Sequence, residues 1–167
     1  PTRRSSDLVQ NWTMLDFQSA LSEVTQNRDF EKGKIALAKA SCLKCHRVGE
    51  EGGRVGPDLT QVGNRFDARA LLESIIEPSK VIDEKYRQTS YVLVNGKVLT
   101  GRPVGVSAKQ ITLETDPNRG LSEIVNRADI EESVISQISP MPAKLTNVLT
   151  REEILDLIAY LKFHKQD

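Results

Sequence analysis

The sequence predicts a mainly α fold in a single domain, with a small antiparallel β insertion. Three segments carry apolar residues at helical spacing, at 29–41, 67–77 and 149–164. A stretch at about 86–135 has the period of strands instead. Aromatic residues make up only 5% of the 167 residues, so we expect a bound cofactor to help fill the core.

The helix at 29–41 has an N-cap and one unusual interior residue. The side chain of Asp29 can cap its first turn. Gly33 in its interior costs about 1 kcal/mol relative to alanine, which suggests that another backbone approaches closely there. The residues expected to share its buried stripe are Phe30, Leu37 and Ala38.

The two later helices have clear boundaries. Pro78 ends the helix at 67–77, and Thr150 and Glu153 open the last helix at capping-box spacing. Between the first two helices, the glycine-rich stretch at 49–66 predicts a structured loop without helix or strand. The expected apolar faces are Leu71, Leu72, Ile75 and Ile76 in one helix, and Ile154, Leu157, Ile158 and Leu161 in the other.

The first 28 residues are polar, with scattered apolar side chains. We expect an N-terminal extension or linker helix at 1–28, followed by the domain proper at 29–167. The pattern at 12–24 favours a short helix that packs on the domain, although the end of a linker from an upstream domain fits it equally.

The β insertion is placed by its turn residues. Asn95-Gly96 lies between two β-rich runs and is a strong hairpin signal. Two further β-rich runs follow at 109–116 and 121–130, so we expect four or five short antiparallel strands. They should form a sheet of at least three strands, because a hairpin alone is only marginally stable. Pro103 cannot donate to a ladder, so it should lie on an edge or at a bulge.

Charge and hydropathy exclude several classes of function. The 23 basic and 23 acidic residues cancel, which argues against nucleic acid as a partner. No apolar run approaches the roughly 20 residues that a membrane-spanning helix needs. The polar residues at 1–7 do not form a signal peptide, so we expect an excised domain or a mature fragment whose targeting signal lies elsewhere.

Cys42, Cys45 and His46 form a C-x-x-C-H motif, the attachment signature for c-type haem. Two thiols at this spacing can meet the two vinyl groups of a porphyrin, and the histidine can supply the proximal nitrogen. Three other interpretations compete: a dithiol redox pair, half of a zinc site, and an incidental structural pair. The one other histidine, His164, is expected to be a solvated surface residue.

A second axial ligand is suggested by Met141, which lies between two prolines. The prolines stiffen the loop, so the thioether would be presented with little freedom. A thioether ligand favours ferrous iron and raises the reduction potential. The other methionine, Met14, is expected to be a packing residue.

The stretches 31–46, 56–66 and 141–164 resemble the class I monohaem cytochromes c. More narrowly, the stretches 52–66 and 71–86 and the strand-rich insertion look like the planctomycete-type putative haem-binding domain. The resemblance implies a mainly α cytochrome c fold around one covalently attached haem c. The β insertion would lie between the third helix and the methionine loop.

The resemblance also implies roles for single residues. Cys42 and Cys45 would carry the thioethers, with His46 and Met141 as the axial iron ligands. The carbonyl of Pro57 would accept a hydrogen bond from the proximal histidine, and Arg65 would meet a haem propionate. Gly33 would lie where the first helix crosses residues 157–160 of the last.

The leading hypothesis for function is a one-electron Fe(III)/Fe(II) relay that serves a redox partner protein or a parent dehydrogenase domain. Haem attachment requires reduced cysteines and export, so we expect a periplasmic or otherwise extracytoplasmic location. Two alternatives remain open: a haem enzyme or gas sensor with a labile sixth ligand, and an interaction module in which the β insertion acts and the haem is only core.

Overall fold

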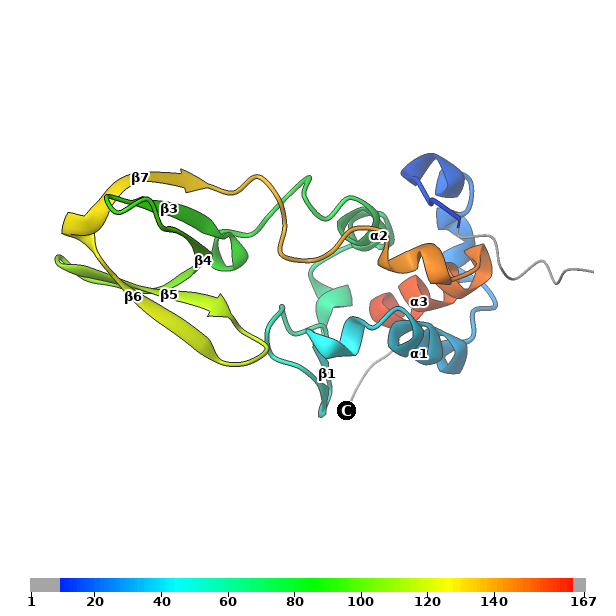
Figure 1. The fold of residues 1–167 in the computed structure, drawn as a ribbon. Coiled ribbons are helices and arrows are strands. Elements are labelled where there is room, and N and C mark those ends of the chain that lie inside the picture. The colour runs from blue at the N-terminus through cyan, green and yellow to red at the C-terminus, as the bar shows by residue number, and fades with distance from the viewer. Residues whose placement is uncertain (1–9, 164–167) are drawn as a thin grey trace, which may run out of the picture. The chain divides into compact units, whose positions relative to one another are not determined.

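The computed structural model describes residues 10–163, which form two compact units (Figure 1). Of the described residues, 10–78 and 142–163 belong to the first unit and Ser79–Met141 form the second. In the described residues the first unit contains α1 (Phe30–Lys39), α2 (Ala68–Ile76), α3 (Arg151–Phe163), β1 (Arg47–Val48) and β2 (Glu51–Gly52). The second contains β3 (Thr89–Leu93), β4 (Val98–Val106), β5 (Gln110–Asp116), β6 (Leu121–Asn126) and β7 (Ile130–Ile135).

The prediction of a mainly α fold is wrong. The seven strands contain more of the described residues than the three α-helices do, and short 3-10 turns account for much of the remaining regular structure. The N-terminal segment at 12–24 is one reason, because it forms the 3-10 helices η1 (Met14–Phe17) and η2 (Leu21–Thr25) and no α-helix. The stretch at 49–66, expected to lack regular structure, contains β2 and the 3-10 helix η4 (Val62–Asn64).

The crossing of α1 with α3 organises the first unit. A Cβ built on Gly33 would lie 2.6 Å from Cβ of Tyr160 and would also overlap the carbonyl oxygen of Asp156. Gly33 is therefore the close-approach residue that its cost in a helix had suggested. Asp29 caps α1 by accepting a hydrogen bond from the Lys32 N–H at 3.1 Å, as predicted.

The expected buried stripe of α1 needs correction. Leu37 is buried, but Phe30 and Ala38 are exposed. The buried face of α1 instead consists of Leu37 together with the small residues Gly33 and Ala36, which let the two helix axes approach. The C-cap residue Ala40 is buried as well.

The last helix, α3, is the centre of the first core. Thr150 and Glu153 form the predicted capping box, with Thr150 N–H donating to Glu153 at 2.7 Å and Glu153 N–H donating to Thr150 at 3.3 Å. From Ile154 to Leu161 every residue is buried, so α3 is enclosed on all sides and not only along one stripe. The helix α2, which ends before Pro78 as predicted, packs against this core through Leu71 and Leu72.

The segment before α1 is part of the same core. Phe17 and Ala20 are fully buried, and Val24 is almost so. They belong to one cluster with the apolar residues of α3. Met14 packs against this cluster, in agreement with the packing role expected for it.

The second unit is a five-stranded antiparallel sheet with the order β6-β5-β4-β3-β7. The predicted hairpin at Asn95-Gly96 joins β3 to β4, and Gly96 adopts a φ of 82° that favours glycine. Pro103 lies at a register shift in the β4–β5 ladder, as expected for a residue without an N–H. The strand β4 is shared, because Val98–Gly101 pairs with β3 and Arg102–Val106 pairs with β5.

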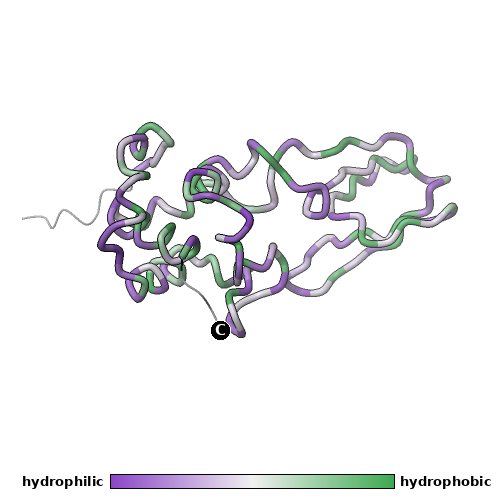
Figure 2. The backbone as a smooth tube through the Cα atoms, turned by 180° about the vertical axis from the view of Figure 1, so that it is seen from behind, coloured by the Kyte–Doolittle hydropathy of each residue, from purple (hydrophilic) through white to green (hydrophobic). Residues whose placement is uncertain are grey.

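Each unit has its own hydrophobic core. The second core is small, and Figure 2 shows hydrophobic and hydrophilic residues alternating along much of the strand region. No helix among residues 10–163 is long and apolar enough to cross a membrane. The buried members of the second core are Tyr91, Leu99, Ile111, Leu113 and Val125.

Candidate functional site

The C-x-x-C-H motif forms a tight turn directly after α1. Ser41 ends the helix in a left-handed conformation, with a φ of 61°. The 3-10 helix η3 (Cys42–Lys44) follows, and the backbone N–H groups of Cys45 and His46 both donate to the carbonyl of Cys42, at 3.2 and 2.9 Å. The two thiols and the imidazole are thus held on one turn that follows directly from α1.

The imidazole of His46 is oriented by a single hydrogen bond. Its Nδ1 lies 2.8 Å from the carbonyl oxygen of Pro57. A carbonyl oxygen can only accept, so the proton of a neutral ring is on Nδ1, and Nε2 carries the lone pair. Among residues 10–163, Nε2 has no hydrogen-bond partner. A histidine arranged in this way can bind a metal ion through Nε2.

The loop after the motif packs closely on the turn. The N–H of Gly53 donates to the carbonyl of Leu43 at 2.9 Å, and the N–H of Gly56 donates to the carbonyl of Cys45 at 2.8 Å. A Cβ on Gly56 would lie 2.7 Å from Cε1 and 2.8 Å from Nδ1 of His46. The missing side chain of Gly56 therefore makes room for the imidazole ring.

No separate feature of the sequence indicates this role for Gly56. The glycine richness of residues 49–66 was visible, but which glycine touches the ring depends on how the loop folds back. Gly53 packs in the same way against the carbonyl of Lys44.

The two cysteines are free and differ in burial. Cys42 is buried, whereas Cys45 is half-buried. Burial raises the pKa of the Cys42 thiol to about 11, so this thiol stays protonated at neutral pH. A catalytic dithiol depends on a lowered thiol pKa, so this environment argues against the redox-pair interpretation.

The zinc interpretation also lacks support. In the described part of the chain no group of three or more His, Cys, Asp and Glu side chains could hold a metal ion. The spare histidine, His164, lies outside the described residues, so its expected exposure stays a prediction.

Arg65 lies at the end of the 3-10 helix η4 and is exposed. One of its terminal nitrogens lies 3.4 Å from the carbonyl oxygen of Asp58, and its guanidinium lies 5.7 Å from the ring centroid of Phe66. Arg65 also lines a cavity of about 790 Å³ in the first unit, together with residues of α1 and of the 47–51 hairpin. The lining of that cavity does not include Cys42, Cys45 or His46.

Met141 is the last residue of the second unit. Its side chain is half-buried, and its N–H donates to the hydroxyl of Ser139 at 3.1 Å. The two flanking prolines leave its loop few conformations. The pairing of Met141 with His46 stays a prediction.

Comparison with known families adds an independent observation. A family model described as Cytochrome c matches residues 30–112. The match supports a cytochrome c family. No similar sequence was found among curated proteins. The matched range contains the whole motif turn, Pro57 and Arg65, and it ends before Met141 and α3.

The residues of the turn fit the haem c that a cytochrome c domain implies. Two free thiols stand three positions apart, and the next residue is a histidine whose Nδ1 is tied to a carbonyl while Nε2 is available. Gly56 leaves space beside the ring, so the imidazole can keep this orientation.

Proposed function

We propose that this chain is an electron-transfer c-type cytochrome domain with one covalently attached haem c. Cys42 and Cys45 would form the thioether bonds, and Nε2 of His46 would bind the iron. The hydrogen bond of His46 to Pro57 carries this proposal, because it fixes the tautomer that a metal-binding imidazole needs. When bound, haem c supplies a one-electron Fe(III)/Fe(II) couple.

Residues of the first unit would influence the redox properties of the haem through the donor strength and the orientation of His46. The carbonyl of Pro57 makes Nε2 of His46 a stronger donor, because it draws on the proton at Nδ1. Gly56 and Gly53 bring the loop backbone against the turn, which limits how far the ring can rotate. A ligand held in one orientation in both oxidation states reduces the rearrangement that accompanies electron transfer.

Met141 is proposed as the second axial ligand, and Arg65 as a partner of a haem propionate. Proline on both sides of Met141 and the hydrogen bond of its N–H to Ser139 support a fixed presentation of the sulfur. The exposed guanidinium of Arg65 forms no ion pair among the described residues, although, after the hydrogen bonds from Thr60, its charge helps to lower the pKa of the nearby Asp58 carboxylate, and this exposure supports a role toward an anionic group. These two residue assignments go beyond what the match to the Cytochrome c family model supports.

The proposed setting is a larger oxidoreductase or a separate redox partner, outside the cytoplasm. Cytochrome c domains are commonly extracytoplasmic, because attachment takes place on reduced cysteines after export. The strand-rich second unit supports the narrower resemblance to the planctomycete-type haem-binding domain with a β insertion. The neutral charge balance favours docking through short-range contacts over salt-dependent steering.

The proposal is tested by producing the protein in a host that matures c-type cytochromes. We expect the mass to exceed that of the polypeptide by one haem and the reduced protein to show a low-spin spectrum. Met141→Ala should keep the haem, lose the sulfur-to-iron charge-transfer absorption and lower the potential. A protein with the mass of its amino acids alone would refute the proposal, and an unchanged Met141→Ala spectrum would refute the ligand. Rapid CO binding by the reduced wild type would instead favour an enzyme or sensor.

A second variant tests the orientation of His46. Gly56→Ala should push the imidazole away from its position, because the new Cβ would overlap the ring. We expect a shift of the visible spectrum and a change in potential, with the haem still attached through Cys42 and Cys45. The matched control is Gly105→Ala, whose Cβ meets only the side chain of Thr112 at 3.3 Å in the second unit. Equal spectra for the two variants would contradict the packing role of Gly56.

A further inference from the structure

The segment that follows Met141 is held by residues from the opposite end of the chain. Residues 142–149, called here the methionine arm, lead from Met141 into α3 and contain the 3-10 helix η7 (Leu145–Val148). Leu149 and Thr146 are buried, and the N–H of Leu149 donates to the carbonyl of Thr146 at 2.9 Å. The arm is therefore fixed from five to eight positions after Met141.

Two contacts join this fixed end to the N-terminal segment. The indole N–H of Trp12 donates to the carbonyl of Leu149 at 3.1 Å. The side-chain amide of Asn147 donates to the side-chain oxygen of Asn11 at 3.0 Å. Trp12 is itself held by Phe17, whose ring centroid lies 5.4 Å away at a tilt of 53° and whose side chain is fully buried.

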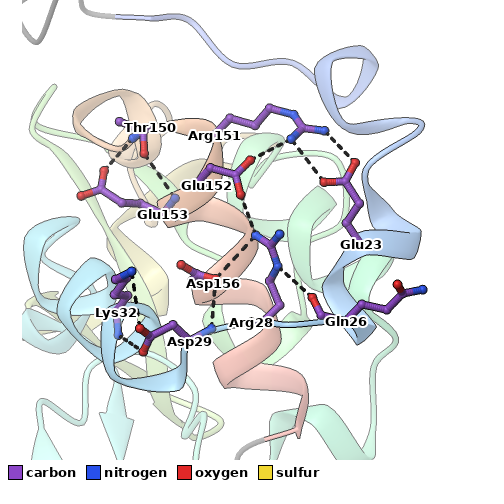
Figure 3. Close-up of polar contacts among 10 residues, drawn as sticks. All are labelled: Glu23, Gln26, Arg28, Asp29, Lys32, Thr150, Arg151, Glu152, Glu153 and Asp156. Atoms are coloured by element: carbon purple, nitrogen blue, oxygen red, sulfur yellow. Dashed lines mark hydrogen bonds and ion pairs between the residues drawn. The ribbon is translucent and has the colours of Figure 1, made fainter.

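Ion pairs continue this attachment into the first turns of α3 (Figure 3). Arg151 pairs with Glu23 at 3.2 Å, and Arg28 pairs with Glu152 at 2.9 Å and with the buried Asp156 at 3.5 Å. The side chains of Arg28 and Asp156 are only 14% and 11% exposed, so this pair is better shielded than an ordinary surface pair. The N-terminal segment thus contacts both the methionine arm and the start of α3.

We infer that residues 11–28 form a bracket that positions the methionine arm, with Trp12 as the main positioning residue. The inference rests on the proposed function, because it needs Met141 as an iron ligand. Proline at 142 and the left-handed backbone of Lys144, at a φ of 67°, stiffen the short connection between Met141 and the bracketed end. Holding the arm still raises the effective concentration of the sulfur at the iron, so loosening the bracket favours a competing ligand.

The test is a titration of the oxidised holoprotein with imidazole, followed by the loss of the sulfur-to-iron charge-transfer absorption. Trp12→Phe removes the N–H but keeps an aromatic ring, and we expect imidazole to displace the methionine roughly fivefold more readily, the effect of one lost hydrogen bond. Asn11→Ala alters an exposed residue and should act in the same direction, which covers a failure of the tryptophan variant to fold. The control Lys34→Gln removes an ion pair with Glu51, outside both the bracket and the arm, and should leave the titration unchanged.

The outcomes separate the bracket from the proposed function. Imidazole affinities equal to the wild type in Trp12→Phe and Asn11→Ala, with only a lower thermal midpoint, overturn the bracket and leave the cytochrome assignment standing. If Met141→Ala keeps the charge-transfer absorption of the wild type, Met141 is not the iron ligand, and the bracket is overturned with it. A missing covalent haem overturns the proposed function as a whole.

Discussion

The two units stabilise themselves in different ways. Among the described residues, the first core has nineteen buried members and surrounds a helix that is enclosed on all sides. The second core has five, and its edge strand β7 has no fully buried residue. All of the predicted site residues except Met141 lie in the first unit, which has the larger core.

The units also differ in how far apart their parts lie in the sequence. The second unit is one continuous stretch, Ser79–Met141, whereas the first joins residues before Pro78 to residues after Pro142. Contacts between distant segments cost more chain entropy before they become favourable. The haem-motif residues thus lie in the unit with extensive packing between distant segments. The sheet of the second unit, by contrast, forms within one continuous stretch of chain.

The largest expected effects come from one core truncation in each unit. Phe17→Ala should destabilise the first unit by about 3–5 kcal/mol, because a fully buried ring is lost, and Leu113→Ala should destabilise the second by about 2–5 kcal/mol. Thermal unfolding followed by NMR separates the two units, since the backbone amide signals of α3 report on the first and those of β5 on the second. Each variant should shift mainly its own transition; a joint shift would show that the two cores unfold together.

A smaller effect should follow from adding one methyl group at a glycine that packs against a neighbouring backbone. Gly33→Ala would force Asp156 and Tyr160 away from α1, and we expect a loss of about 1–3 kcal/mol in the first unit. Gly101→Ala is the counterpart in the second unit, where the Cβ would overlap the carbonyl of Glu114. Chemical denaturation measures both. A neutral Gly33→Ala would mean that the helix crossing can widen without cost.

The smallest effect concerns acid stability of the first unit. The hydrogen bond from Arg28 lowers the pKa of Glu152 below its usual value of 4.5. Its stabilising contribution is therefore full above about pH 4.5 and is lost as the pH falls through the lowered pKa. Glu152→Gln should remove this part of the pH dependence, at a cost below about 1 kcal/mol at neutral pH, since Glu152 is largely exposed. Unfolding curves at pH 3 and pH 7 check this, and an unchanged acid slope would contradict it.

The sequence predicted correctly those features that depend on interactions between neighbouring residues. The caps at Asp29 and Thr150, the hairpin at Asn95-Gly96 and the bulge at Pro103 each depend on neighbouring residues, and each is confirmed. The mainly α prediction failed because the segment at 12–24 and the loop at 49–66 have no local signal strong enough to fix their structure. Their conformations are decided by what they pack against.

The sequence by itself determined the chemistry of the candidate site, since two thiols and an imidazole at fixed spacing on one turn need no distant partner to be recognised. Only the tertiary structure decided how that turn is supported. The fit of Gly56 against His46, the enclosure of α3 and the attachment of Trp12 to Leu149 join residues that are distant in the chain. Such contacts depend on the balance of packing over the whole unit, and no short pattern of residues encodes them.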